Sequence, residues 1–191
     1  SFEYTIIDRS QLNRPSSTAT VYLNVLPINK APTITLNGDQ IVLEDSGAHV
    51  VSGYAYNIAS SPAGANEAPQ ELSISLNSTN PALFSLQPTI DLSTGTLSYT
   101  LADNAFGTAV VFATLRDNGG TAFGGIDSTL RVFVIQVDPV NDVPTFSILP
   151  NHNSLEDAGP QIIQNFASDI SAGANENQAL NFIITNDNPD L

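Results

Sequence analysis

The sequence of 191 residues predicts an all-β protein built from β-sandwich modules, and three observations support this prediction. Apolar and polar residues alternate with the period of two that is typical of strands, as at Leu72, Ile74 and Leu76. Gly, Asn and Pro separate the alternating segments, and no segment carries a convincing helical stripe of apolar side chains. Long segments of the sequence also recur along the chain.

Seven short strands are expected within one repeat. About seven strands in ~100 residues are typical of an immunoglobulin-like β-sandwich. The segment from Ser60 to Asn66 is the one place where a short helical turn is expected. The expected strands span residues 33–36, 40–43, 48–54, 72–76, 97–101, 111–115 and 132–137.

The repeat divides the chain into three pieces. The segment Leu43–Gly47 recurs 112 positions later as Leu155–Gly159. The segment Ala63–Glu67 recurs 109 positions later as Ala172–Glu176. Such extended self-similarity indicates an array of tandem modules, of which this chain covers a segment. The expected pieces are the C-terminal part of one repeat and its linker (1–31), a complete repeat (32–143) and the N-terminal part of the next (144–191).

The composition excludes several classes of function. The chain has no Cys and two His, His49 and His152, so we expect no disulfide, no thiolate metal site and no His-rich metal centre. Nineteen acidic residues against five basic ones make nucleic acid an unsuitable partner. No apolar run reaches the ~18 residues of a membrane span. The motifs of nucleophilic enzymes are missing, and we expect no enzymatic activity.

The linker after the complete repeat is the most informative acidic segment. It reads Asp138-Pro139-Val140-Asn141-Asp142. Ca²⁺ is bound in proteins by six to eight oxygen atoms from carboxylates, amide groups and backbone carbonyls. A linker with two Asp and one Asn can supply several of them, and neighbouring loops must supply the rest. The alternative is a solvated acidic linker.

A family resemblance rests on this linker and on three further motifs. The segments 111–117 and 132–146 look like the end of a cadherin repeat and its linker. Leu43–Gly47 resembles the motif that follows the first cadherin strand, and Phe166–Ser171 resembles the Ala-x-Asp-x-Asp segment with its second acid replaced by Ser171. The Leu-Asp-Arg-Glu signature of animal cadherins is missing. The pattern is similar to cadherin-like and immunoglobulin-like repeats of large bacterial surface adhesins.

The resemblance implies an extracellular, calcium-stiffened rod. Its partners would be neighbouring repeats of the same or an identical chain, together with cell-surface or matrix polymers. Strands of a sandwich alternate between its two poles, which brings acids from several loops toward one linker. The resemblance, which this geometry supports, implies Ca²⁺ ligands among Glu44, Asp45, Asp138, Asn141, Asp142 and Asp169.

The first linker is expected to be poor in calcium. Leu26 and Lys30 stand where the second linker has Asp138 and Asp142. The ammonium group of Lys30 could replace a cation there and pair with Asp117, whose loop should face this linker.

Three functions are compatible with these observations. The leading hypothesis is a structural repeat of a large bacterial surface adhesin or stalk that serves cell adhesion or biofilm formation. The second is a subunit of an extracellular filament or sheath, assembled by strand completion between chains. The third is a cadherin-like module that binds polysaccharide, which the absence of Trp makes less favourable.

Overall fold

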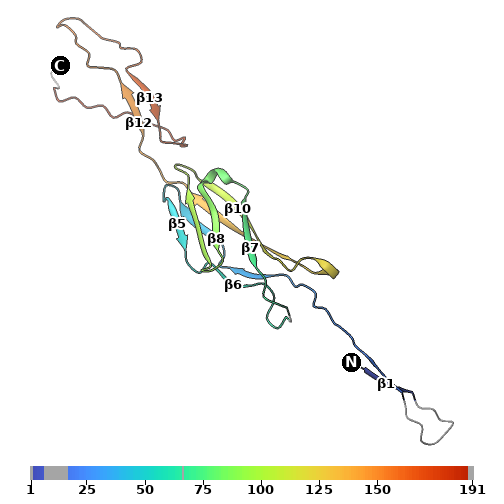
Figure 1. Ribbon diagram of the computed structural model, residues 1–191. Coiled ribbons are helices and arrows are strands. Elements are labelled where there is room, and N and C mark those ends of the chain that lie inside the picture. The colour runs from blue at the N-terminus through green and yellow to red at the C-terminus, as the bar shows by residue number, and fades with distance from the viewer. Residues whose placement is uncertain (1, 7–16, 66, 189–191) are drawn as a thin grey trace, which may run out of the picture.

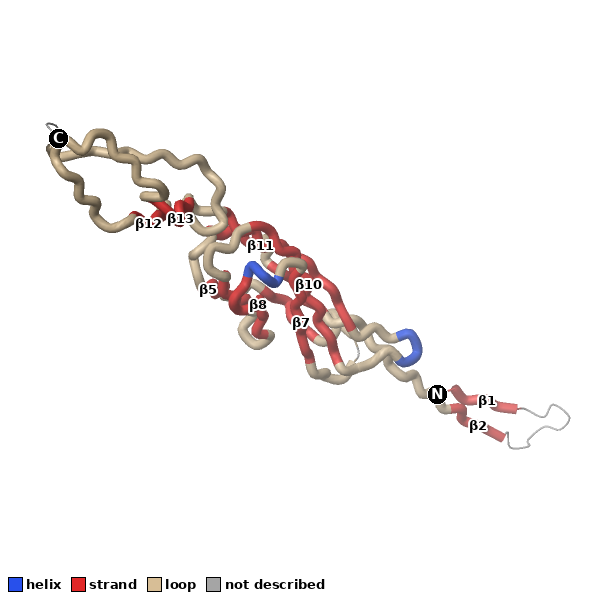
Figure 2. The backbone as a smooth tube through the Cα atoms, turned by 90° about the horizontal axis from the view of Figure 1, so that it is seen from above, coloured by secondary structure: helices blue, strands red, loops and turns tan. Residues whose placement is uncertain are grey.

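A computed structural model describes residues 2–6, 17–65 and 67–188 of the chain, and these residues form an all-β structure. A β-sandwich occupies the middle, with one strand pair beyond each of its two ends (Figures 1 and 2). The outer pairs are β1 (Phe2–Ile6) with β2 (Ser17–Val21), and β12 (Thr145–Ile148) with β13 (Ala167–Ser171).

One sheet of the sandwich has four strands in the order β4-β11-β10-β7. β4 runs parallel to β11, and the other neighbours are antiparallel. Because β4 lies beside the last strand of the sandwich, the chain segment after β4 is brought to the place where β11 ends. The strands are β4 (Gln40–Leu43), β7 (Leu72–Ser78), β10 (Gly107–Asp117) and β11 (Ser128–Asp138).

The facing layer consists of a strand pair, β3-β6, and a three-stranded sheet, β5-β9-β8. The two parts are joined by a hydrogen bond of 2.8 Å from the backbone N–H of Ala55 to the carbonyl of Gly95. The strands are β3 (Thr33–Leu36), β5 (Ala48–Val51), β6 (Ala55–Ala59), β8 (Phe84–Asp91) and β9 (Thr96–Leu101).

The core lies between these two layers, within residues 34–137. Alternate residues of β10 are fully buried, as the period of two requires. Tyr54 packs edge-on against Phe133, with 5.2 Å between ring centroids. Burial of one large apolar side chain stabilises the fold by about 1.5–3 kcal/mol, so the alternating strands supply most of the driving force. The buried residues of β10 and β11 are Ala109, Val111, Ala113, Leu115, Phe133, Ile135 and Val137.

The sandwich has nine strands where about seven were predicted. β6 and β8 are the two additional strands. The predicted strand 48–54 ends at Val51, and Gly53 turns the chain with a φ of 64°. The helical turn predicted from Ser60 is not found in residues 60–65, and Asn66 lies outside the described residues. Short 3₁₀ turns occur instead at Pro81–Leu83 (η1) and Ala122–Gly124 (η2). Within the described ranges, no helix is long and apolar enough to cross a membrane.

The outer strand pairs have the registers of pairs within the sandwich. Every pair of residues matched between β12 and β13 corresponds, 112 positions earlier, to a pair between β3 and β6, with an irregularity at the same place. The β1–β2 pair matches β10–β11 in the same way, with offsets of 109 and 112. Examples are Thr145 opposite Ser171 with Thr33 opposite Ala59, and Phe2 opposite Val21 with Val111 opposite Phe133.

Candidate functional site

Glu44 joins the sandwich to the second linker. The backbone N–H of Glu44 donates to the carbonyl of Asp138 (2.9 Å), which extends the pairing of β4 with β11 by one residue. The carboxylate then lies over the linker, where its Oε1 accepts a hydrogen bond of 2.7 Å from the N–H of Val140. Glu44 is 3% exposed, and its Oε2 is buried with no hydrogen-bond partner. A buried carboxylate oxygen without a donor is a position where a cation would be stabilising.

Asp142 joins the same linker to the segment that follows β13. Its backbone N–H donates to Oε1 of Glu176 (2.8 Å). The amide nitrogen of Gln178 donates both to Oε2 of Glu176 (2.8 Å) and to Oδ1 of Asn141 (2.7 Å). Oδ2 of Asp142 is buried and unpaired. The linker is therefore held from both sides by side chains.

The side chains of Asp45, Asp138 and Asp169, the other predicted calcium ligands, make other contacts. Asp45 accepts a hydrogen bond from the N–H of Asn104 (2.7 Å), and Asp138 accepts one from the side chain of Gln136 (2.7 Å). Asp169 accepts one from the neighbouring hydroxyl of Ser168 (3.1 Å).

The structure thus brings four of the six predicted ligands into the linker contacts described above, Asp138 and Asp142 through their backbone groups. In the described ranges, no three or more His, Cys, Asp or Glu side chains are arranged to hold a metal ion. Calcium at the second linker stays a prediction. The four residues that make these contacts are Glu44, Asp138, Asn141 and Asp142.

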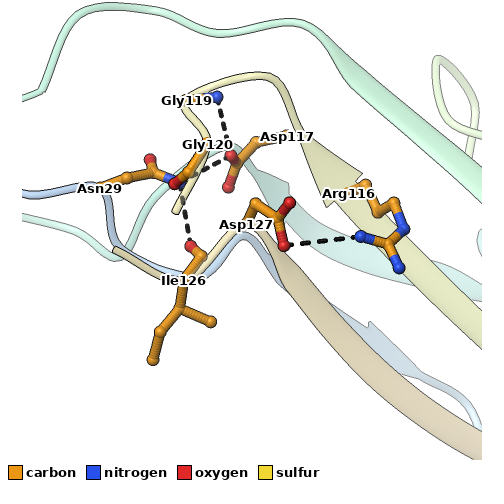
Figure 3. A network of polar contacts seen from close by, with 7 residues as sticks. All are labelled: Asn29, Arg116, Asp117, Gly119, Gly120, Ile126 and Asp127. Atoms are coloured by element: carbon orange, nitrogen blue, oxygen red, sulfur yellow. Dashed lines mark hydrogen bonds and ion pairs between the residues drawn. The ribbon is translucent and has the colours of Figure 1, made fainter. Parts of the chain in front are cut away.

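Asn29 ties the first linker to the loop between β10 and β11. Its amide nitrogen donates to Oδ1 of Asp117 (2.8 Å) and to the carbonyls of Gly120 and Ile126 (both 3.0 Å), as Figure 3 shows. In return, the N–H of Ile126 donates to the carbonyl of Asn29 (3.1 Å). The loop therefore faces the linker, as predicted.

The predicted pairing of Lys30 with Asp117 is wrong. Asp117 accepts its hydrogen bonds from Asn29 and from the N–H of Gly119 (3.0 Å). Within the described part of the chain, the one ion pair joins Arg116 to Asp127 at 3.5 Å. The physical reason is that Asn29 occupies the position facing the carboxylate, while Lys30 is exposed.

Two residues that sequence reasoning left without a role belong to these contacts. The amide nitrogen of Gln70 donates to Oδ1 of Asn29 (2.8 Å) and to Oε2 of Glu67 (3.3 Å). Gln178 makes the equivalent contacts with Asn141 and Glu176. The signal was present in the sequence, because Glu67 and Gln70 belong to the segment that recurs at 172–178.

Comparison with known proteins identified no relative: no family model and no curated protein matches the chain. The fold and the contacts at its two ends therefore carry the functional argument.

Proposed function

We propose that the chain is part of an extracellular rod of tandem cadherin-like β-sandwiches, from a large bacterial surface adhesin or stalk. Its role is mechanical and non-enzymatic: it acts as a spacer within the rod and stiffens it. The observation that carries this proposal is the recurrence of register, in which each outer strand pair repeats a pair of the sandwich. Repeats that recur in sequence and in strand pairing are typical of linear arrays, in which each module contacts its neighbours alone.

Stiffening in this proposal depends on the linkers. A rod bends where its modules join, so contacts across the linker determine its stiffness. Glu44 and Glu176 approach the second linker from the two sides, through hydrogen bonds to Val140 and to Asp142. The unpaired oxygens of Glu44 and Asp142 support the proposal that Ca²⁺ adds to these contacts. A bound ion would satisfy buried acceptors for which the described residues supply no donor.

Small-angle X-ray scattering of the chain with calcium and with a chelator tests this function. Calcium is expected to lengthen the particle and narrow its distribution of dimensions, because bending at residues 139–144 is restricted. Asp142→Asn should abolish the response. Asp103→Asn removes the same charge at an exposed position and should preserve it. Identical scattering with and without calcium would contradict a calcium-stiffened rod.

A second candidate, a subunit of a filament or sheath, is favoured by an apolar pocket beyond the second linker. Phe146 and Phe182 meet edge-on there, with 5.2 Å between ring centroids, and both are about half exposed. In a filament, a strand from another chain would cover this pocket. Sedimentation at increasing concentration separates the candidates: polymers that Phe146→Asp disrupts support the filament, and a monomer at every concentration supports the rod.

A further inference from the structure

Two Asn-Gly pairs occur in the chain, and both lie in loops of the sandwich. Asn37-Gly38 joins β3 to β4, and Asn118-Gly119 lies between β10 and β11. In such a pair the backbone nitrogen of the glycine can attack the side-chain carbonyl carbon of the asparagine, because glycine has no Cβ that hinders the approach. Asparagine is accordingly among the thermolabile residues. Since the two pairs are chemically alike, the structure around each pair determines its reactivity.

The second pair is held by its surroundings. The N–H of Gly119 donates to Oδ1 of Asp117 (3.0 Å), and Oδ1 of Asn118 accepts a hydrogen bond from the N–H of Glu71 (3.0 Å). The backbone is also packed closely here, because a Cβ on Gly119 would lie 2.5 Å from Oε1 of Gln70. Both the attacking nitrogen and the attacked carbonyl are therefore fixed to other groups, and the reaction requires these contacts to break.

The first pair lacks these restraints. Asn37 and Gly38 are both exposed. Within the described ranges, neither the side-chain amide of Asn37 nor the N–H of Gly38 makes a hydrogen bond. A Cβ added to Gly38 would meet no atom within 4 Å, so this side of the loop is open. The two reacting groups can therefore approach each other without the loss of a hydrogen bond.

We propose that Asn37 is a site of spontaneous deamidation and backbone isomerisation, from which Asn118 is protected. The nitrogen of Gly38 forms a bond to Cγ of Asn37 and releases its proton to solvent. The side-chain nitrogen takes up a proton and leaves as ammonia, which gives a cyclic succinimide. Water then opens the ring at one of its two carbonyls and yields aspartate or isoaspartate. Water is the one co-reactant, nothing is oxidised or reduced, and the site does not depend on the chain's belonging to a rod.

The two products have different effects on the sandwich, because the loop is anchored to a buried tyrosine. The N–H of Asn37 donates to the carbonyl of Tyr54 (2.9 Å), and the hydroxyl of Tyr54 donates to the carbonyl of Gly38 (2.6 Å). Isoaspartate places one additional carbon atom in the main chain between these two contacts. The hydroxyl of Tyr54 would then lose its acceptor inside the protein, which is unfavourable. Aspartate leaves the length of the main chain unchanged and preserves both contacts.

Incubation of the native chain at mildly alkaline pH, followed by peptide mapping with mass spectrometry, tests the site. Asn37 should be converted at least about tenfold faster than Asn118, because reaction at Asn118 requires the loss of a hydrogen bond to a carboxylate. The same incubation in urea is the control. Once the structure is removed, the two pairs should react at similar rates. Equal conversion of the two pairs in the native chain, faster conversion at Asn118, or conversion of Asn37 in urea alone would overturn the proposal.

Thermal unfolding of the incubated chain tests the consequence for Tyr54. The fraction that contains isoaspartate should melt lower by about 4 °C or more, the shift expected when a domain of this size loses one buried hydrogen bond. Asn37→Asp, which reproduces the other product, should melt like the fresh chain. Asn37→Gln keeps the amide but disfavours the five-membered ring, and its melting temperature should be unchanged by incubation. Isoaspartate at position 37 without a lower melting temperature would contradict the anchoring role of Tyr54.

Discussion

The carboxylate of Glu44 accepts a hydrogen bond of 2.7 Å from the backbone N–H of Val140, across 96 positions of the sequence. This contact joins the segments that follow two neighbouring strands, because Glu44 comes directly after β4 and Val140 lies two residues beyond the end of β11. It also fixes the point where the second linker begins. The buried side chain of Glu44 thus contributes both to the stability of the sandwich and to the position of the linker that follows it.

Glu44→Ala should lower the free energy of unfolding by about 1.5–3 kcal/mol, the contribution of a hydrogen bond to a charged group, because the N–H of Val140 loses its acceptor. Glu44→Gln keeps an acceptor and should cost less. Urea unfolding in a chelator, followed by Tyr fluorescence, measures both. The control Glu71→Ala removes an exposed acid of the same sandwich and should change stability by less than about 0.5 kcal/mol. Equal effects at both positions would show that the buried contact is unimportant.

Gly95 and Gly53 allow a matched test of close packing between the β3-β6 pair and the β5-β9-β8 sheet, the two parts of the facing layer. Both have positive φ, 67° and 64°. A Cβ on Gly95 would collide with the carbonyl oxygen of Ala55, whereas one on Gly53 would meet open space. Gly53→Ala should cost about 1–2 kcal/mol from backbone strain alone. Gly95→Ala should cost more, by about 1–3 kcal/mol of overpacking, in the same urea assay. Similar values for the two variants would contradict the contact.

His49 should make the sandwich sensitive to mild acid. Its ring stacks on Tyr99 at 5.0 Å between centroids, and burial lowers its pKa below the ordinary 6.5. The unfolded chain therefore binds the proton first, so this residue's contribution to stability is present above pH 6.5 and is lost as the pH falls toward the folded-state pKa. A proton NMR titration measures the pKa, with His152→Asn assigning the signal. His49→Gln should reduce the change in stability between pH 7 and pH 5, and an unchanged slope would contradict the prediction.

The strands with clean alternation could be predicted from the sequence, and the two missed strands show why others could not. β8 contains Pro88, and its pairing with β9 shifts register between Leu86 and Thr89. Proline is tolerated there because β8 is an edge strand, a fact that belongs to the sheet order rather than to the segment. β6 pairs with β3 through a shift in register, and Asn57 within it has a φ of 52°. Such irregularity removes the period of two on which the prediction depends.

The contacts at the ends of the sandwich were only partly predictable, because they join distant segments. Asn29 meets Asp117 across 88 positions, and an alignment of repeats cannot place one loop against another. Comparison of the linkers drew attention to Lys30, the position that changes between repeats. The side chains that recur unchanged, Asn29 and Gln70 with their counterparts, proved to make the same contacts twice. The residues that recur unchanged were therefore a better guide to the contacts at the linkers than the residue that differs between repeats.

Exchange of Lys30 in the first linker and Asp142 in the second tests whether the junctions at the two linkers bind calcium in the same way. Lys30 occupies the repeat position of Asp142, and it lines a pocket together with Glu67, the counterpart of Glu176. Lys30→Asp should raise the calcium affinity of the first junction by roughly tenfold, because affinity rises with the number of charged ligands. The reciprocal Asp142→Lys should abolish binding at the second junction, since it sets an ammonium group beside Glu176.

Calorimetry with calcium, read together with the NMR signals of each junction, measures both effects. Lys30→Gln is the control, because it removes the positive charge and adds no carboxylate. It should give only the smaller gain of long-range electrostatics, which added salt screens. If Lys30→Asp and Lys30→Gln bind calcium equally, position 30 does not reach the ion and the two junctions are built differently. If Lys30→Asp binds more tightly in salt as well, the carboxylate is a ligand and the lysine is what keeps the first junction weaker than the second.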